Sequence, residues 1–320
     1  MSELTPLQEL RSKIEEIIVG QESVIDRLLI ALLSGGHVLL EGPPGLAKTT
    51  LVHALAAGMS ASFQRVQFTP DLMPADLTGS EVFDANSGQF RFVEGPLFHE
   101  VLLADEINRA PPKVQSALLE SMAEHQITVA GKTYPLPPVF MVLATQNPLE
   151  QSGTYPLPEA QLDRFLFKIV LDYPSIDEEI EITRRARAAQ EGHVEADMQA
   201  LLTPSDLLTL RKTLSSVYIE ERIERFAIEL VSATRQLDQY VPEWGGYVKA
   251  GASPRASIAL LQAATASALL DQRDYVIPED IHSLAIDVLR HRLVLSFSAK
   301  ADGVTEEAII HRLLETLPAV

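Results

Sequence analysis

The chain has 320 residues, with 44 acidic and 26 basic side chains and a formal net charge of −18. Hydrophobic residues make up 46% and charged residues 22%, as in globular proteins, which excludes an intrinsically disordered chain. The absence of cysteine excludes disulfides, thiolate metal sites and cysteine nucleophiles. The length favours two domains.

The negative charge is spread along the whole chain. Residues 1–170 contain 20 acids and 11 bases, and residues 171–320 contain 24 acids and 15 bases. Neither part has the basic cluster that binding to a nucleic-acid backbone requires. We therefore expect no nucleic-acid partner. The acidity indicates a solvated surface or, alternatively, a face for a basic protein partner.

The sequence contains no segment typical of export or of the membrane. Its start, MSELTPLQELRSK, has acids where a secretory signal needs a basic and then an apolar stretch. The longest uncharged stretches, 256–270 and 133–149, are interrupted by polar residues or prolines. These features predict a cytoplasmic protein without membrane insertion.

The first half alternates helical and strand patterns. Apolar residues at helical spacing predict helices over 7–18, 24–33 and 49–57. Short apolar runs predict strands over 37–42, 63–68, 101–104, 139–144 and 165–171. Such alternation indicates an α/β fold with a parallel sheet covered by helices on both faces. Turn signals predict two inserted hairpins, at 81–92 and 126–136.

Strand signals are weak in the second half, where the pattern becomes helical. We expect helices at 175–190, from 203–206 onward, and at 223–237, 254–270, 278–289 and 305–317. The sequence therefore predicts an α/β nucleotide-binding core over residues 1–179. An all-helical domain is expected over residues 180–320.

The segment GPPGLAKT, from Gly42 to Thr49, lies between a predicted strand and a predicted helix. Glycines at this place let backbone N–H groups face phosphate oxygens beside the positive end of the helix. Lys48 is expected to contact the β- and γ-phosphates of ATP, and the Thr49 hydroxyl to ligate Mg²⁺. Ala47 stands where such loops usually have glycine, and because its methyl group removes no donor, binding is expected to survive. The expected nucleotide contacts in this loop are Gly42, Pro43, Pro44, Gly45, Leu46, Ala47, Lys48, Thr49 and Thr50.

A second apolar strand, VLLADE, ends in two acids, and 56 residues separate Lys48 from the first of them, Asp105. Asp105 is placed to hold Mg²⁺ through water, and Glu106 to take a proton from the water that attacks the phosphate. Two solvated acids after a strand would be the plainer interpretation. Together with the preceding phosphate loop, the pair indicates nucleotide hydrolysis.

Two more polar residues follow later strands and helices. Asn147, in VLATQNP, is a candidate to orient the attacking water or contact the γ-phosphate, although an Asn-Pro turn explains it equally. Arg164, in LDRF, is a candidate arginine finger that stabilises negative charge in the transition state, although a surface salt bridge is the plainer interpretation.

These four elements, in this order, resemble the AAA+ ATPases, and the chain is most similar to the MoxR family. The resemblance rests on IIVGQE, EGPPGLAKT, RVQFTPDLMPADLTG, FRFVEGPLF, LLADEINRAPPKVQSALLESM, ATQNP and EAQLDRFLF. It covers nearly the whole chain. The resemblance implies an AAA+ P-loop core followed by a helical lid, with the two hairpins as the helix-2 insert and the pre-sensor-1 hairpin.

The resemblance also assigns roles that the residues alone do not. Asn147 becomes sensor 1, and GASPRA presents Arg255 from the lid to the nucleotide as sensor 2. A second loop is implied to lie near the adenine, and Arg109 to face a neighbouring subunit. The residues of that loop are Val19, Gly20 and Gln21.

Such proteins are generally hexameric rings. The resemblance implies that Arg164 acts on the nucleotide of a neighbouring protomer, because Arg164 and Lys48 are expected on opposite faces of one protomer. MoxR-like ATPases are thought to assemble or activate other proteins, often with a partner that carries a von Willebrand factor A domain. The resemblance therefore implies a chaperone-like ATPase. A metal-chelatase motor subunit, a nucleic-acid-directed motor and a nucleotide-gated scaffold are the alternatives.

Overall fold

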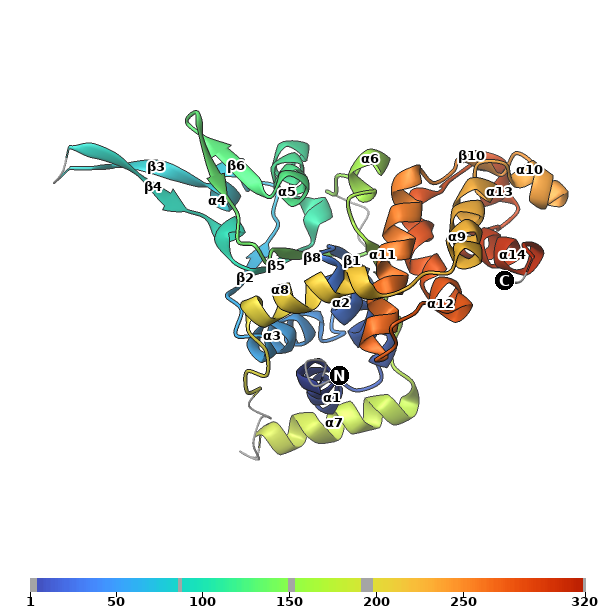
Figure 1. The fold of residues 1–320 in the computed structure, drawn as a ribbon. Helices are drawn as coiled ribbons and strands as arrows, with labels where there is room; N and C mark the ends of the chain where they lie inside the picture. Colours follow the sequence, from blue (N-terminus) through green and yellow to red (C-terminus); the bar gives the residue numbers. More distant parts are fainter. Residues whose placement is uncertain (1–4, 86–87, 149–152, 191–197, 319–320) are drawn as a thin grey trace. The chain divides into compact units, whose positions relative to one another are not determined.

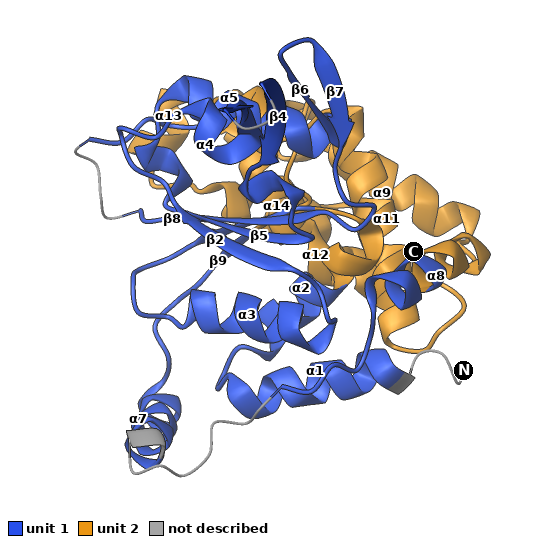
Figure 2. Ribbon diagram, turned by 90° about the vertical axis from the view of Figure 1, so that its left-hand side faces the viewer, with its two compact units in different colours: residues 1–29, 37–157, 169–209 blue, residues 30–36, 158–168, 210–320 orange. Residues whose placement is uncertain are grey.

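A computed structural model describes residues 5–85, 88–148, 153–190 and 198–318 of the chain (Figure 1). The chain divides into two compact units that interleave in the sequence (Figure 2). The first unit comprises residues 1–29, 37–157 and 169–209, and the second comprises residues 30–36, 158–168 and 210–320. The 179/180 domain boundary that the sequence indicates stays a prediction.

A five-stranded sheet with the order β2-β5-β8-β1-β9 is the centre of the fold. The strands are β1 (Val38–Glu41), β2 (Phe63–Gln67), β5 (Val101–Asp105), β8 (Met141–Gln146) and β9 (Phe167–Val170). The pairs β2/β5, β5/β8 and β8/β1 are all parallel. Residues 101–104 and 141–145 are fully buried, because helices cover both faces of the sheet. The predicted α/β class is confirmed.

Helices flank the sheet within the first unit. In Figure 2, α1 and α3 lie on one side of it, and α4 and α5 lie on the other. Their bounds are α1 (Thr5–Ile17), α3 (Lys48–Gly58), α4 (Pro74–Thr78) and α5 (Pro112–Glu124). The helix α2 (Glu22–Ser34) precedes β1, and α7 (Ile176–Gln190) and α8 (Pro204–Thr213) follow β9.

Two antiparallel hairpins extend from the first unit. They are β3 (Gly79–Asp84) with β4 (Gln89–Glu94), and β6 (Gln126–Val129) with β7 (Lys132–Pro135). The rings of Phe92 and Tyr134 stack between the hairpins, with centroids 4.1 Å apart and an interplanar angle of 18°. Lys132 Nζ also lies 3.5 Å from Glu81 Oε1. The hairpins therefore contact each other as well as the core.

The second unit is mostly helical. It contains α6 (Glu159–Leu162), α9 (Glu221–Ala233), α10 (Leu237–Tyr240), α11 (Pro254–Leu270), α12 (Pro278–Leu289), α13 (Phe297–Ala301) and α14 (Glu306–Thr316). Short strands β10 (Val248–Ala250) and β11 (Val294–Leu295) form an antiparallel pair that the sequence patterns did not indicate. Buried alanines and leucines of α11 pack against α9 and α12. Among the described residues, we find no helix with the length and apolarity to cross a bilayer.

The helix predicted over 223–237 ends at Ala233. The next residue, Thr234, is fully buried, and its hydroxyl donates to Val231 O and accepts the Ala252 N–H. The backbone of Gly251 lies against Thr234 so closely that a Cβ there would collide with its carbonyl. A contact between distant segments thus ends the helix.

Candidate nucleotide-binding site

The phosphate loop connects β1 to α3, as the sequence predicts. The chain turns through two left-handed residues, Gly45 (φ 88°) and Ala47 (φ 52°), before α3 begins at Lys48. Glycine adopts this conformation freely, whereas an alanine in it is strained. Ala47 offers no side-chain cap to α3, so the N–H groups of the first helical turn are left for a ligand.

Lys48 reaches back over this loop. Its Nζ donates to Gly42 O at 2.7 Å. Burial lowers the pKa of Lys48, and the carboxylates of Asp105, Glu106 and Glu41 partly oppose this shift. The cation is therefore held at the mouth of the loop, beside the two acids that end β5.

Asp105 is held on both of its carboxylate oxygens. Thr145 of β8 donates its hydroxyl to Oδ1 at 2.6 Å, and the Arg65 guanidinium of β2 contacts Oδ2 at 2.5 Å. Thr145 is buried, so the Asp105 side chain is oriented by a rigid neighbour. The Arg65 side chain is 48% exposed, and such an ion pair is easily exchanged for another cation.

Glu106 is the second non-glycine residue of the site with a left-handed backbone, at φ 56°. Its N–H donates to Thr145 Oγ1 at 2.8 Å. Its carboxylate Oε2 accepts from Gln67 Nε2 at 2.7 Å and from Arg109 at 2.9 Å. Adjacent side chains of an extended strand point to opposite faces, whereas Glu106, with its left-handed backbone, lines the same pocket as Asp105.

A pocket of about 460 Å³ brings these groups together in the first unit. The sequence-predicted residues that line it are Gly42, Pro44, Gly45, Leu46, Ala47, Lys48, Thr49, Thr50, Asp105, Glu106 and Asn147. Thr49 and Asp105 are oxygen donors of the kind that Mg²⁺ prefers, so the residues present fit a magnesium ion. Among the described residues there is no cluster of three or more His, Cys, Asp or Glu that would hold a different, all-protein metal centre.

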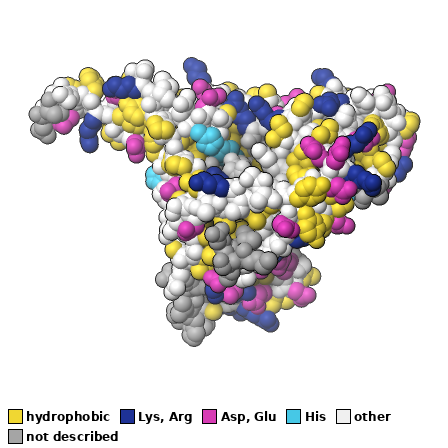
Figure 3. Space-filling view, viewed as in Figure 1, with side chains coloured by type: hydrophobic (Ala, Val, Ile, Leu, Met, Phe, Trp, Pro, Cys, Tyr) yellow, Lys and Arg dark blue, Asp and Glu magenta, His cyan; other side chains and the backbone are white. Residues whose placement is uncertain are grey.

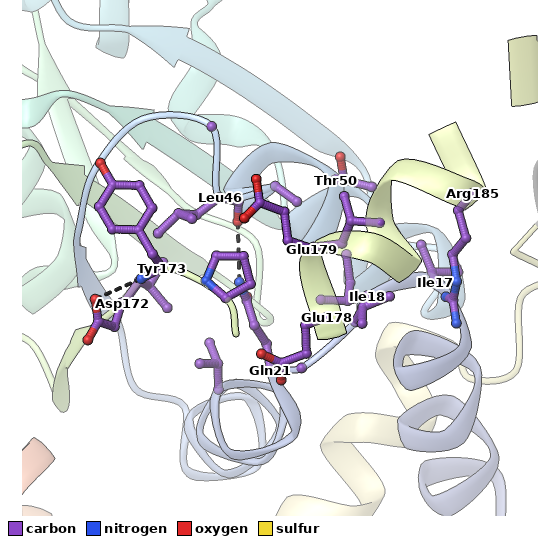
Figure 4. Close-up of a pocket in the computed structure, with 18 of the residues that line it drawn as sticks. Ile17, Ile18, Gln21, Leu46, Thr50, Asp172, Tyr173, Glu178, Glu179 and Arg185 are labelled. Carbon is purple, nitrogen blue, oxygen red and sulfur yellow. Dashed lines mark hydrogen bonds between the residues drawn. The ribbon is translucent and has the colours of Figure 1, made fainter. Parts of the chain in front are cut away.

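A second pocket, of about 600 Å³, also borders the phosphate loop (Figure 4). Val19, Gly20 and Gln21 line it, together with loop residues 44–47 and the α7 residues Glu178 and Glu179. Gln21 Nε2 donates to Leu46 O at 3.5 Å, while its buried Oε1 has no hydrogen-bond partner among the described residues. An unpaired buried amide oxygen beside the phosphate loop fits a purine base that offers a donor.

Comparisons with known proteins agree with this geometry. The family model for the ATPase family associated with various cellular activities (AAA) matches residues 37–167, and that for the AAA lid domain matches residues 246–313. The chaperone MoxR1 of Mycobacterium tuberculosis is 45% identical over 99% of this chain and 83% of its own length. Protein MoxR of Methylorubrum extorquens is 32% identical over 96% of this chain and 93% of its own.

The chain belongs to the MoxR family of AAA+ ATPases. A solved structure agrees: that of a proposed ATPase from Cytophaga hutchinsonii is 45% identical, with a TM-score of 0.93. The match covers 100% of this chain and 96% of that one. Membership in this AAA+ family supports nucleotide binding and ATPase activity in general terms.

The two arginines with expected roles in AAA+ catalysis both lie in the second compact unit. Arg164 follows α6, and Arg255 is in the first turn of α11 with its side chain 66% exposed. Asp163, the residue before Arg164, contacts the start of α11. Its Oδ2 lies 3.6 Å from the Arg255 guanidinium and accepts a hydrogen bond from the Ser253 hydroxyl at 3.3 Å. The P-loop belongs to the first unit.

The side chains that orient Asp105 and Glu106 were not predicted from the sequence. Arg65 and Gln67 contact Asp105 and Glu106, and Thr145 contacts both residues. A signal was present, since Arg65 and Gln67 are two apart on a short strand and therefore point to the same face. That β2 lies beside β5, however, is set by the strand order, which the pattern of apolar residues does not encode.

Proposed function

We propose that this protein is a Mg²⁺-dependent ATPase that converts ATP and water to ADP and phosphate and uses the cycle to remodel protein partners. The observation that carries the proposal is the meeting of Lys48, Asp105 and Glu106 in one pocket beside an uncapped helix N-terminus. Phosphate charge is stabilised by such N–H groups and by lysine. The base is proposed to occupy the pocket beside Gln21.

Thr49 and Asp105 are proposed to hold Mg²⁺, Asp105 through water. When bound, the metal ion neutralises charge on the phosphates. Lys48 exchanges its contact with the Gly42 carbonyl for phosphate oxygens, and Arg65 gives up its exposed ion pair with Asp105. The resting contacts of these cations are thus with groups that nucleotide binding replaces.

Glu106 is the proposed general base, and Asn147 the proposed partner of the attacking water. The Glu106 carboxylate is held by hydrogen bonds from Gln67 and Arg109. For turnover, the Glu106 side chain is proposed to leave at least one of these contacts, so that its carboxylate can reach the attacking water. Arg109 is the last residue of the short turn Ile107–Arg109, which precedes α5.

Arg164 is proposed to act on the nucleotide of a neighbouring protomer in a homo-oligomeric ring, hexameric as the family resemblance implies. Arg255 is proposed to contact the nucleotide as sensor 2, and its guanidinium lies 3.6 Å from Asp163 Oδ2. Guanidinium groups stabilise the charge that develops on the transferred phosphoryl group.

The β3–β4 hairpin is the proposed contact with protein partners. Phe83 and Phe90 face each other across its strands and are 55% and 66% exposed, and Val82 and Val93 are exposed as well. Figure 3 shows hydrophobic side chains along this arm. Exposed apolar groups of this kind mark interaction surfaces. Chaperone function, named for the relative MoxR1, and a partner with a von Willebrand factor A domain are the corresponding proposals.

The test combines three variants. Lys48→Ala is expected to weaken nucleotide binding, whereas Glu106→Gln should keep binding and lower turnover by about 100-fold or more, because the general base is lost. Arg164→Ala is expected to be inactive alone and to regain activity when mixed with Lys48→Ala, since each supplies the half-site that the other lacks. Phosphate release measures turnover, and a fluorescent ATP analogue measures binding.

Three results would contradict the proposal. Wild-type turnover in Glu106→Gln would rule out Glu106 as the general base. No rescue in a mixture shown to co-assemble would rule out Arg164 as a finger acting on a neighbouring protomer. Stimulation of turnover by DNA, persisting as the salt concentration is raised, would favour a nucleic-acid motor instead.

A further inference from the structure

Arg292 is a buried arginine that the catalytic cycle proposed above does not use. It ends a short turn, Arg290–Arg292, that follows α12, and its side chain is only 3% exposed. Burial of an arginine requires that its charge be paired and its N–H groups be satisfied. Its hydrogen-bond acceptors on a distant segment of the chain all lie within residues 163–166.

The guanidinium holds that segment through both side chain and backbone. Nε donates to Asp163 Oδ1 at 2.7 Å, and the terminal nitrogens donate to Phe165 O at 2.7 Å, Leu166 O at 3.2 Å and Asp163 O at 3.4 Å. A further contact, to Val288 O, fixes the guanidinium to α12 itself. The carbonyls on both sides of Arg164 are therefore fixed by one planar group.

The neighbouring residue His291 adds a second contact to the same segment. Its ring is buried and donates from Nε2 to Phe165 O at 3.0 Å. Asp163, which Arg292 holds, is also the residue that lies 3.6 Å from Arg255. The turn after α12 thus fixes the backbone that carries Arg164 and the carboxylate that faces Arg255.

We propose that Arg292 is a positioning residue that sets the place of the Arg164 guanidinium at the subunit interface. This inference rests on the trans role proposed for Arg164. A rigid arginine fork is suited to the task because it fixes several acceptors in one plane, which a lysine cannot do. A small displacement of a catalytic group is costly, since misplacement by about 1 Å can lower a rate about 100-fold.

The test compares Arg292→Met with the control Arg290→Met. Arg290 belongs to the same turn but pairs with Asp287 and Glu307 instead of the 163–166 segment. Arg292→Met is expected to lower the turnover number by up to about 100-fold while KM for ATP and the assembled mass stay near wild type. Arg290→Met should retain wild-type turnover.

Mixing experiments separate positioning from a general loss of structure. Arg292→Met carries an intact phosphate loop, so it should regain activity with Lys48→Ala, which supplies an intact finger. It should not regain activity with Arg164→Ala, because every finger in that mixture is defective. A role in nucleotide binding would give the reverse pattern and would overturn the proposal, as would wild-type turnover in Arg292→Met.

The pair Lys48→Ala with Arg164→Ala is the reference for these mixtures. Failure of that reference pair would refute the trans finger and this inference with it, whereas failure of the Arg292→Met mixtures alone refutes only the inference. If Arg292→Met does not assemble, Arg292→Lys decides, because lysine keeps the charge opposite Asp163 but loses the fork. Lowered turnover at unchanged KM in Arg292→Lys would support the positioning role, and unchanged turnover would contradict it.

Discussion

Two residues with left-handed backbone conformations flank the phosphate pocket, Ala47 at φ 52° and Glu106 at φ 56°. Neither is a glycine, so each is strained and must be held by its surroundings. At Glu106 the holding groups are Thr145, Gln67 and Arg109. Strain at the second acid is functional in this interpretation, because it accompanies a backbone that lets Glu106 line the same pocket as Asp105.

At Ala47 the strain has no such use, and we predict that glycine is tolerated there. Ala47→Gly relieves the left-handed strain but adds freedom to the unfolded chain, so the expected net gain is at most about 1 kcal/mol of unfolding free energy. Affinity for ATP should stay unchanged because no N–H donor is lost. Urea unfolding measures the stability and nucleotide titration the affinity, and a lower unfolding midpoint or a weaker affinity in Ala47→Gly would contradict the prediction.

His291 predicts a pH dependence of stability. Burial, aided by the Arg292 charge, lowers the pKa of His291 well below its ordinary 6.5. The unfolded chain takes up this proton below about pH 6.5 while the folded protein does not, so stability is full above that pH and falls below it, by up to about 1.4 kcal/mol per pH unit.

The variant His291→Gln isolates this contribution, because its side-chain amide can still donate to Phe165 O. Unfolding free energies are measured from about pH 7.5 to about pH 5, where other groups contribute equally to both proteins. The variant is expected to lose less stability toward low pH than the wild type. Parallel pH profiles would show that His291 is protonated in the folded protein or accessible to water.

At the scale of elements, local patterns predicted which segments form the sheet but not how they pair. The predicted strands correspond to β1, β2, β5, β8 and β9. The central strands β1, β5 and β8 are the most clearly apolar, because a buried parallel strand is apolar on both faces. The order β2-β5-β8-β1-β9 depends on contacts between distant segments. For the same reason the acids Asp105 and Glu106 could be recognised from sequence, whereas their partners Arg65 and Gln67 could not.

The two hairpins offer a prediction at this scale. The stack of Phe92 on Tyr134 joins β4 to β7, and aromatic pairs contribute about 0.5–1.5 kcal/mol beyond their burial. A double-mutant cycle with Phe92→Ala and Tyr134→Ala, followed by urea unfolding, should give a coupling free energy in that range. The pair Phe83→Ala and Tyr134→Ala is the control and should be additive, and additivity in the test pair would mean that the hairpins are independent.

At the scale of the whole molecule, the proposed site is divided between protomers. Lys48, Asp105 and Glu106 are proposed to supply the nucleotide-binding half, and Arg164 the half offered to a neighbour. A negative charge of −18 keeps protomers apart, so assembly has to overcome repulsion and should be favoured by salt. Under the proposed division of the site, activity is tied to assembly.

The measurement that tests this central claim most directly is ATP turnover as a function of protein concentration, with the mass of the same samples read by light scattering. Turnover per protomer is predicted to rise steeply over the concentrations at which the oligomer forms, and Arg164→Ala should form the oligomer without the rise in turnover. Turnover that stays constant in a species shown to be a monomer would contradict a site shared between protomers.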